Sequence, residues 1–142
     1  MKAIDHPLVR ALLALALPAD DFVIAGSGPL LAHGIRSDIG DLDVVARGKA
    51  WSKAQALAES SPAPFGEGVK RILLQGGEIE ILNGWFPEIW TVDSLIERAD
   101  VIDGIKYASL QDVCRWKQKL NRPKDQEDLA LIACYMSRAM PS

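Results

Sequence analysis

The chain has 142 residues, of which 49% are hydrophobic and 25% are charged, a composition typical of one globular domain. The formal net charge of −3 argues against a broad electrostatic grip on nucleic acid. The apolar run 11–17 ends at Pro18 and favours a short helix over a signal peptide, and no run reaches the length of a transmembrane helix. We therefore expect a cytoplasmic protein without a membrane partner.

The first half of the chain alternates helical and extended patterns. Pro7 and Pro29 each suit the first turn of a helix, and the apolar run 22–25 has the look of a buried strand. Pro18 and Gly34 end their respective helices. In chain order, the sequence predicts a helix at 7–17, a strand at 22–25, a helix at 29–33, a strand at 41–46 and a helix at 49–59.

The second half begins with a loop rich in Pro and Gly at 60–68. Strands at 69–75 and 78–82 follow, joined across Gly76-Gly77 as a hairpin. A helix is predicted at 92–98, a short hairpin around Asp103-Gly104, and helices at 110–120 and from Pro123 onward. The last helix carries an apolar stripe with helical spacing, formed by Leu129, Ile132, Ala133 and Met136.

This order of elements predicts an α/β (α+β) fold with a small mixed sheet flanked by helices. We expect a single domain over residues 1–142, with its core at about 20–107 and C-terminal helices at about 109–139. The two cysteines, Cys114 and Cys134, have no spacing typical of a zinc site or a disulfide framework.

Gly26 and Ser27 lie where the first strand gives way to a helix. Small residues at such a turn let backbone N–H groups approach a phosphate, and the helix N-terminus favours an anion there. The Ser27 hydroxyl adds one more donor. The pattern also occurs in plain turns, so this signal alone leaves both interpretations open.

Asp41 and Asp43 are two residues apart on a predicted strand, so their carboxylates point to the same face. Like charges at that distance repel each other unless a cation or a proton separates them. Mg²⁺ suits such a pair because it binds carboxylate oxygens and keeps positions open for phosphate. The alternative is a solvated strand edge.

A third acid is available on the strand at 78–82. Glu78 and Glu80 share one face of it, and either completes a metal site if this strand lies beside that of Asp43. We favour Glu80, because Ile79 and Ile81 flank it. The alternative is the polar face of a half-exposed strand.

These residues together resemble the nucleotidyltransferase superfamily. Its signature is a hydrophobic-Gly-[Gly/Ser] turn, a spacer, an Asp-x-Asp/Glu pair and a third acid on a later strand. Here the matching segments are Ile24-Ala25-Gly26-Ser27, Asp41-Leu42-Asp43 and Ile79-Glu80-Ile81. The segment 122–129, Arg-Pro-Lys-Asp-Gln-Glu-Asp-Leu, is similar to a helix start in small bacterial members, including relatives of toxin–antitoxin nucleotidyltransferases.

The resemblance implies a role for each matching residue. Gly26 and Ser27 correspond to the turn that contacts the phosphates of the nucleotide. Asp41 and Asp43 correspond to Mg²⁺ ligands. Glu80 corresponds to the third acid, a metal ligand and base for the attacking hydroxyl, with Glu78 as its rival. Lys124 lies where a cation meets the triphosphate.

The function expected from this resemblance is Mg²⁺-dependent transfer of a nucleoside monophosphate from an NTP to a hydroxyl-bearing acceptor. The alternative is a non-catalytic nucleotide-binding protein or toxin–antitoxin component on the same fold. A partner protein or a second copy would complete an open acceptor site. Trp85 is the tryptophan we expect nearest a bound base or acceptor, and a basic run either lines the cleft or forms a solvated helix face: Arg115, Lys117, Lys119, Arg122 and Lys124.

Overall fold

The computed structural model describes residues 2–139, and within them seven strands form one mixed sheet in the order β3-β4-β5-β2-β1-β7-β6. This arrangement confirms the predicted α/β class. Both predicted hairpins are present as antiparallel pairs, β4 with β5 and β6 with β7. The strands are β1 (Phe22–Ala25), β2 (Leu42–Ala46), β3 (Ser60–Pro62), β4 (Lys70–Leu74), β5 (Ile79–Leu82), β6 (Asp100–Ile102) and β7 (Ile105–Tyr107).

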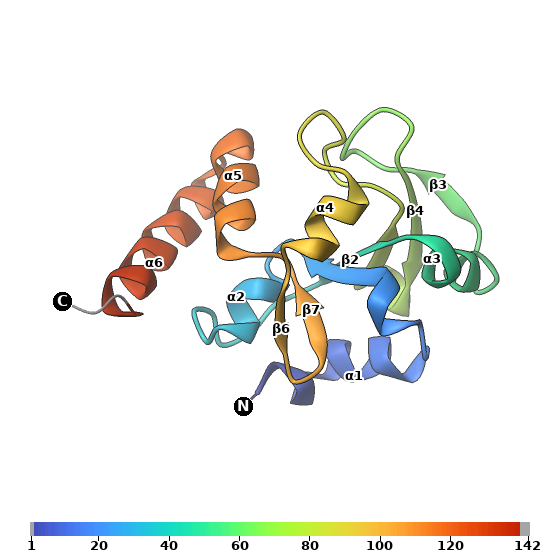
Figure 1. Ribbon diagram of the computed structural model, residues 1–142, viewed down its shortest axis with the longest axis horizontal. Coiled ribbons are helices and arrows are strands. Elements are labelled where there is room, and N and C mark those ends of the chain that lie inside the picture. Colours follow the sequence, from blue (N-terminus) through green and yellow to red (C-terminus); the bar gives the residue numbers. More distant parts are fainter. Residues whose placement is uncertain (1, 140–142) are drawn as a thin grey trace.

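Helices cover both faces of the sheet. In Figure 1, α1 runs along the lower side of the sheet, α4 and α5 lie on the upper side, and α6 packs against α5 at the end of the chain. The helices are α1 (Pro7–Ala14), α2 (Gly28–Ala32), α3 (Gly48–Gln55), α4 (Val92–Glu97), α5 (Leu110–Leu120) and α6 (Pro123–Ala139). Single 3₁₀ turns are η1 (Ala3–Asp5), η2 (Ala19–Asp21) and η3 (Gln75–Gly77).

Alternation along the central strands divides the core in two. Ile24, Val44 and Ile81 pack with α1 and α3 on one face of the sheet. Val23 and Val45 pack with α4 and α5 on the other. Because successive strand residues point to opposite faces, every second residue of β1 and β2 joins the same layer. The central strands are thus buried on both sides, which holds them rigidly.

Three predicted elements differ from the structure by more than one residue at a boundary. The first helix ends at Ala14 and not at Leu17, because Ala16 takes a left-handed conformation with a φ of 54°. The helix at 49–59 ends at Gln55. The predicted loop at 60–68 contains β3, a fully exposed edge strand. Its residues, Ser60-Ser61-Pro62, carry no apolar alternation, and Pro is tolerated at a sheet edge, so its sequence resembles a loop.

The apolar stripe predicted for the last helix packs differently from the prediction. Only Ile132 of its four residues is buried, and Met136 is 38% exposed. The buried face of α6 consists of Asp125, Asp128 and Ile132, a spacing of three and four residues that places them on one side of a helix. Two acids therefore face inward, so α6 contacts the rest of the domain through ionic as well as apolar side chains. No helix among residues 2–139 is long and apolar enough to cross a membrane.

A contact between β1 and α2 yields a test of the packing. A Cβ added at Gly28 would lie 2.3 Å from Cγ2 of the buried Ile24, and a β-branched side chain in a core strand moves little. Alanine favours a helix over glycine by about 1 kcal/mol, but overpacking costs about 1–3 kcal/mol. We expect Gly28→Ala to lower the free energy of unfolding by about 1–2 kcal/mol in urea denaturation.

The control is Gly40→Ala, because, apart from its two chain neighbours, no atom of the described residues lies within 4 Å of a Cβ built there. Its free energy of unfolding should stay within about 0.5 kcal/mol of wild type. If Gly28→Ala proves as stable as Gly40→Ala, the close β1–α2 contact described above is incorrect.

Candidate active site

The site is built on one row of residues that runs across three strands. Ala25 of β1 pairs with Asp43 of the antiparallel β2, and Asp43 pairs with Glu80 of the parallel β5. Directly paired residues point to the same face of a sheet. The carboxyl groups of Asp43 and Glu80 are close enough to share a hydrogen bond. Strand register, and no special loop, therefore brings the two acids together.

Gly26 makes room for the Asp43 carboxyl group. A Cβ added at Gly26 would lie 2.3 Å from Oδ2 of Asp43, and Gly26 has a φ of 60°. Glycine is the residue that takes this conformation most readily and brings no side chain into the gap. The sequence predicts that Gly26 contacts a phosphate group. The structure shows that its first role is to let the backbone pass closely over Asp43.

The residues selected from the sequence line one cavity of about 130 Å³: Gly26, Ser27, Asp41, Asp43, Glu80 and Lys124. Glu78 does not belong to this set. It is exposed and borders a different hollow beside His6 and Asp38, although its backbone oxygen accepts a hydrogen bond from the N–H of Leu42. Of the two rival glutamates, the structure brings Glu80 to the aspartates.

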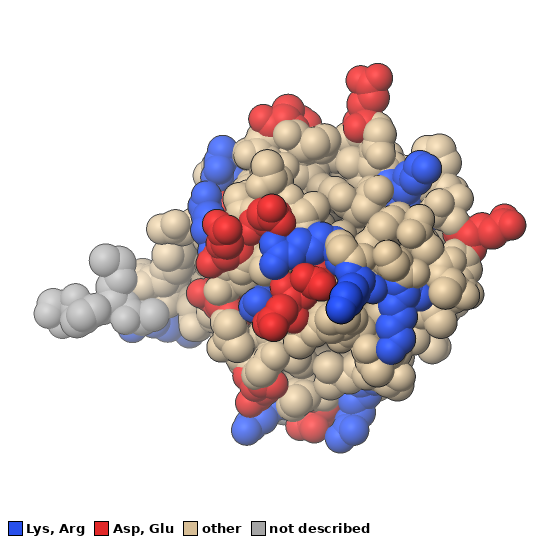
Figure 2. Space-filling model, turned by 45° about the vertical axis from the view of Figure 1, so that its right-hand side comes forward, with Lys and Arg blue, Asp and Glu red and all other residues tan. Residues whose placement is uncertain are grey.

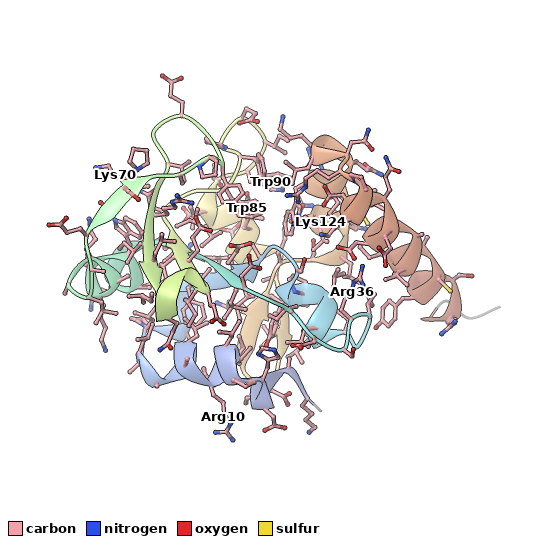
Figure 3. All side chains as sticks on the ribbon, turned by 180° about the vertical axis from the view of Figure 1, so that it is seen from behind. Arg10, Arg36, Lys70, Trp85, Trp90 and Lys124 are labelled. Atoms are coloured by element: carbon pink, nitrogen blue, oxygen red, sulfur yellow. The ribbon has the colours of Figure 1, made fainter. Side chains whose placement is uncertain are left out.

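A groove adjoins this cavity and shares Ser27, Asp41 and Lys124 with it. The groove has a volume of about 510 Å³ and extends along the loop 36–40 to Arg36 and Asp128. In Figure 3, Trp85 and Lys124 lie between the sheet and the last two helices, and Arg36 lies farther along α6. The two hollows therefore adjoin each other, and Asp41 borders both.

Burial and neighbouring acids hold Asp43 close to its protonated form. Removal from water, followed by the charges of Asp41 and Glu80, raises the pKa of Asp43 from 3.8 to about 7. Lys124 acts in the opposite direction and lowers it. At neutral pH a carboxyl group with this pKa is about half protonated, and a cation that binds beside it would favour the charged form.

The oxygen chemistry of the acids fits Mg²⁺, which prefers carboxylates and retains open positions. Within residues 2–139, however, no group of three or more His, Cys, Asp or Glu side chains is arranged as a ready-made metal site. Asp43 and Glu80 face each other, and Asp41 lines the same cavity. The side chains of these three acids would have to rotate before they could bind one metal ion together.

Arg71 of β4 engages the third acid. Its Nη1 lies 3.2 Å from Oε1 of Glu80, whose side chain is 14% exposed. Arg71 and Leu73 share a face of β4, and Leu73 pairs with Glu80 across the sheet. One oxygen of Glu80 is thus held by a guanidinium, and its carboxylate meets Asp43 on the other side.

A turn between α5 and α6 places two cations at the cavity. Asn121 ends α5 in the left-handed conformation, with a φ of 49°, which asparagine tolerates better than most residues. Asp125 then accepts from the backbone N–H of Arg122 at 3.0 Å and from its Nε at 2.6 Å. Burial tends to raise the pKa of Asp125, but these bonds to Arg122 outweigh it and keep the pKa below its usual range. Lys124 is left exposed one residue beyond the turn.

Buried ion pairs fasten α6 to α5 and to the loop after α2. Lys117, 3% exposed, places its Nζ 2.9 Å from Oδ2 of Asp128 and 3.7 Å from Oδ1 of Asp125. Arg36 donates from Nε to Oδ1 of Asp128 at 2.8 Å. The segment 122–129 therefore anchors α6 to α5 and to Arg36, and its Lys124 lines the cavity that contains the acids.

Sequence reasoning missed part of this site. Arg71 gave no signal, because an arginine on an edge-proximal strand is usually solvated. Phe65 and Trp116 line the cavity beside Trp85 but come from segments remote in the chain. The basic run divides in three. Lys119 pairs with Glu88 at the surface, Arg115 lies over the ring of Trp90, and the cavity is lined by Lys117, Arg122 and Lys124.

The comparisons with known proteins add no constraint: no family model, curated protein or solved structure matches the chain.

The raised pKa of Asp43 predicts how stability depends on pH. The unfolded carboxyl group releases its proton near pH 3.8, whereas the folded one keeps it to about pH 7, so folding takes up a proton between these values. At 1.36 kcal/mol per pKa unit, the gap amounts to about 4 kcal/mol. Without divalent cations, we expect the free energy of unfolding to fall by a few kcal/mol from pH 4 to pH 8. Asp43→Asn should remove most of this fall.

Urea denaturation at pH 4, 6 and 8 checks this prediction. Glu78→Gln is the matched control, because it removes a carboxylate two residues from Glu80 but outside the cavity. The free energy of unfolding of this variant should depend on pH as that of wild type does. An Asp43→Asn variant that loses as much stability with pH as wild type would show that another group takes up the proton.

Proposed function

We propose that this protein is a Mg²⁺-dependent nucleotidyltransferase that moves a nucleoside monophosphate from an NTP to a hydroxyl-bearing acceptor. The observation that carries the proposal is the shared cavity, where Asp41, Asp43 and Glu80 face Lys124. Acids alone occur on many surfaces. A carboxyl pair in which burial and like charge raise the pKa of Asp43, together with the exposed Lys124, is what a metal-bound polyphosphate would complete.

The groove provides the place for the triphosphate. Lys124 and Arg36 border it, and cations of this kind neutralise the charge that develops on a leaving pyrophosphate. The Ser27 hydroxyl makes no capping bond to α2 and serves as a donor to a phosphate oxygen. Because α2 spans only Gly28–Ala32, its dipole contributes little, and these side chains have to do most of the phosphate binding.

The acids supply the remaining roles. Asp41 and Asp43 would hold Mg²⁺, which when bound stabilises negative charge on the phosphate oxygens. The acceptor oxygen forms a bond to the α-phosphorus while the bond from that phosphorus to the bridging oxygen of pyrophosphate breaks. The proton of the acceptor hydroxyl passes to the carboxylate of Glu80, within the same cavity.

One observation favours the alternative, a nucleotide-binding protein that performs no transfer. Arg71 already holds one oxygen of Glu80 at 3.2 Å, and the other acid in contact with Glu80 is Asp43. If these contacts persist when nucleotide is bound, Arg71 and Asp43 compete with the acceptor hydroxyl for the Glu80 carboxylate. Such a protein would bind Mg²⁺-NTP as a sensor or as one component of a toxin–antitoxin pair.

The acceptor would approach from solvent. The cavity is smaller than the roughly 300–1,000 Å³ of typical ligand pockets, so an acceptor site has to be completed outside it, by a partner protein or a second copy. Figure 2 shows acidic and basic side chains intermixed near the middle of one face. Such intermixing offers no single-sign track for a long polyanion there. We place the reaction in the cytoplasm, where NTPs are available.

Calorimetric titration with a non-hydrolysable NTP, with and without Mg²⁺, tests the proposal. Wild type should bind only when Mg²⁺ is present. Asp43→Asn should lose the metal-dependent binding, since it removes a ligand. Lys124→Ala should weaken the affinity about 10- to 150-fold while keeping its dependence on Mg²⁺, because a charged hydrogen bond contributes about 1.5–3 kcal/mol.

Lys49→Ala is the control for lost charge, because Lys49 is exposed on α3 and does not line the cavity or the groove. Its affinity should equal that of wild type. Absence of Mg²⁺-dependent binding by wild type would contradict the proposal. Binding without labelling of any acceptor in a broad screen with radioactive NTP would favour the alternative.

A further inference from the structure

The loop between α2 and β2 carries Asp41, and its residues 36–41 have no regular secondary structure. Asp43 is fixed by its pairing with both neighbouring strands. Asp41, by contrast, is exposed and directly precedes β2. The place of the Asp41 carboxylate therefore depends on the contacts that hold this loop.

Two side-chain contacts tie the loop to helices on either side of it. Arg36 donates from Nε to Oδ1 of Asp128 on α6 at 2.8 Å, so one end of the loop is held at that helix (Figure 3). Nearer to Asp41, Oδ1 of Asp38 lies 2.7 Å from Nε2 of His6, the residue that precedes α1. These contacts join segments 92 and 32 residues apart in the chain, so they define where the loop lies in the fold.

The surroundings of His6 commit it to the contact with Asp38. His6 is 5% exposed, and its Nδ1 accepts a hydrogen bond from the backbone N–H of Leu8 at 3.1 Å, which caps α1. Because a neutral imidazole has one accepting and one donating nitrogen, Nε2 carries the hydrogen and donates it to Asp38. This bond, followed by one from the N–H of Ile39, holds the pKa of Asp38 below its usual range. The acceptor is thus a carboxylate.

The loop forms one wall of the groove that is proposed to hold the triphosphate. Asp38 and Ile39 border this groove, and on their other side they border the hollow of about 390 Å³ next to His6. His6 itself lines neither the groove nor the cavity of the acids. Any effect of His6 on a ligand bound there would therefore have to pass through the loop.

We propose that His6 is a positioning residue for the metal site, because its hydrogen bond to Asp38 holds the loop where Asp41 can bind Mg²⁺ together with Asp43. This inference rests on the proposed function and adds a residue remote from the acids to it. When only a fraction of molecules has the competent conformation, the apparent affinity falls by that fraction. Release of the loop should therefore weaken binding although every group that contacts the ligand is still present.

His6→Asn isolates the contact with the loop. Asparagine is among the best N-cap residues, so the cap of α1 is kept, whereas its shorter side chain ends before the position of Nε2. The matched control is Arg10→Ala, which removes an exposed ion pair with Asp5 on the same stretch of chain and leaves the His6–Asp38 bond in place. Ile105→Val shortens a buried side chain of β7 and shows what a loss of stability alone does to binding.

Calorimetry with Mg²⁺ and the non-hydrolysable NTP analogue that wild type binds most tightly measures the affinity, and urea denaturation measures the stability of each variant. We expect His6→Asn to weaken the affinity about three- to tenfold, the effect of one hydrogen bond. Arg10→Ala and Ile105→Val should bind as wild type does.

A double-mutant cycle with Asp38→Ala identifies the route of the effect. Asp38→Ala also removes a negative charge beside the groove, but this change is common to both arms of the cycle and cancels. In a protein that already carries Asp38→Ala, His6→Asn should cause no further loss of affinity, because the loop has already been released.

The results that overturn this inference differ from those that overturn the proposed function. If wild type binds Mg²⁺-NTP and His6→Asn binds it equally well, or if Ile105→Val weakens binding as much as His6→Asn does, His6 only supports the fold. An additive cycle would show that His6 does not act through Asp38. If wild type shows no Mg²⁺-dependent binding, the proposed function itself fails, and His6 has no metal site to position.

Discussion

The site depends on the register between β2 and β5. Parallel pairing places Asp43 directly beside Glu80, and a shift of one residue would turn Asp43 into the opposite core layer. The apolar neighbours Leu42 and Val44 fix this register because both are fully buried. The fold therefore forces two carboxyl groups together in a largely buried place, and the raised pKa of Asp43 follows from that constraint. The hydrophobic core positions the acids, at the cost of their mutual repulsion.

The opposite wall of the cavity is held by charge. Asp125 and Asp128 are buried and pair with Arg122 and Lys117 from the preceding turn and helix. Removing one partner from a buried pair such as Lys117–Asp128 commonly costs about 3–5 kcal/mol, because the remaining charge has lost its compensation. These ion pairs fix the start of α6. Lys124 lies there beside the acids, and its charge lowers the pKa of Asp43. The acidic and basic walls thus have separate structural supports.

Much of this arrangement could be predicted from the sequence, because local patterns encode it. The buried strand at 22–25, the helix at 110–120 and the turn at Gly76-Gly77 all have local signals. Asp41 was predicted on one strand with Asp43 but directly precedes β2, and it lines the same cavity as Asp43. What escaped prediction depends on contacts between distant segments. Three aromatic residues that line the cavity, Phe65, Trp85 and Trp116, come from segments far apart in the chain. The Arg71–Glu80 pair depends on strand register. Asp128 matched a motif, but its partner Arg36 lies 92 residues earlier.

The central claim is that Asp41 and Asp43 hold a divalent cation that binds nucleotide. Crystals of the protein soaked with Mn²⁺ and a non-hydrolysable NTP, measured at a wavelength where manganese scatters anomalously, test it most directly. The account predicts an anomalous peak about 2.1 Å from carboxylate oxygens of both aspartates and in contact with the triphosphate, as expected for a small oxygen-bound cation. A peak beside Glu78 and Asp38 instead, or nucleotide bound with no metal at Asp43, would contradict it.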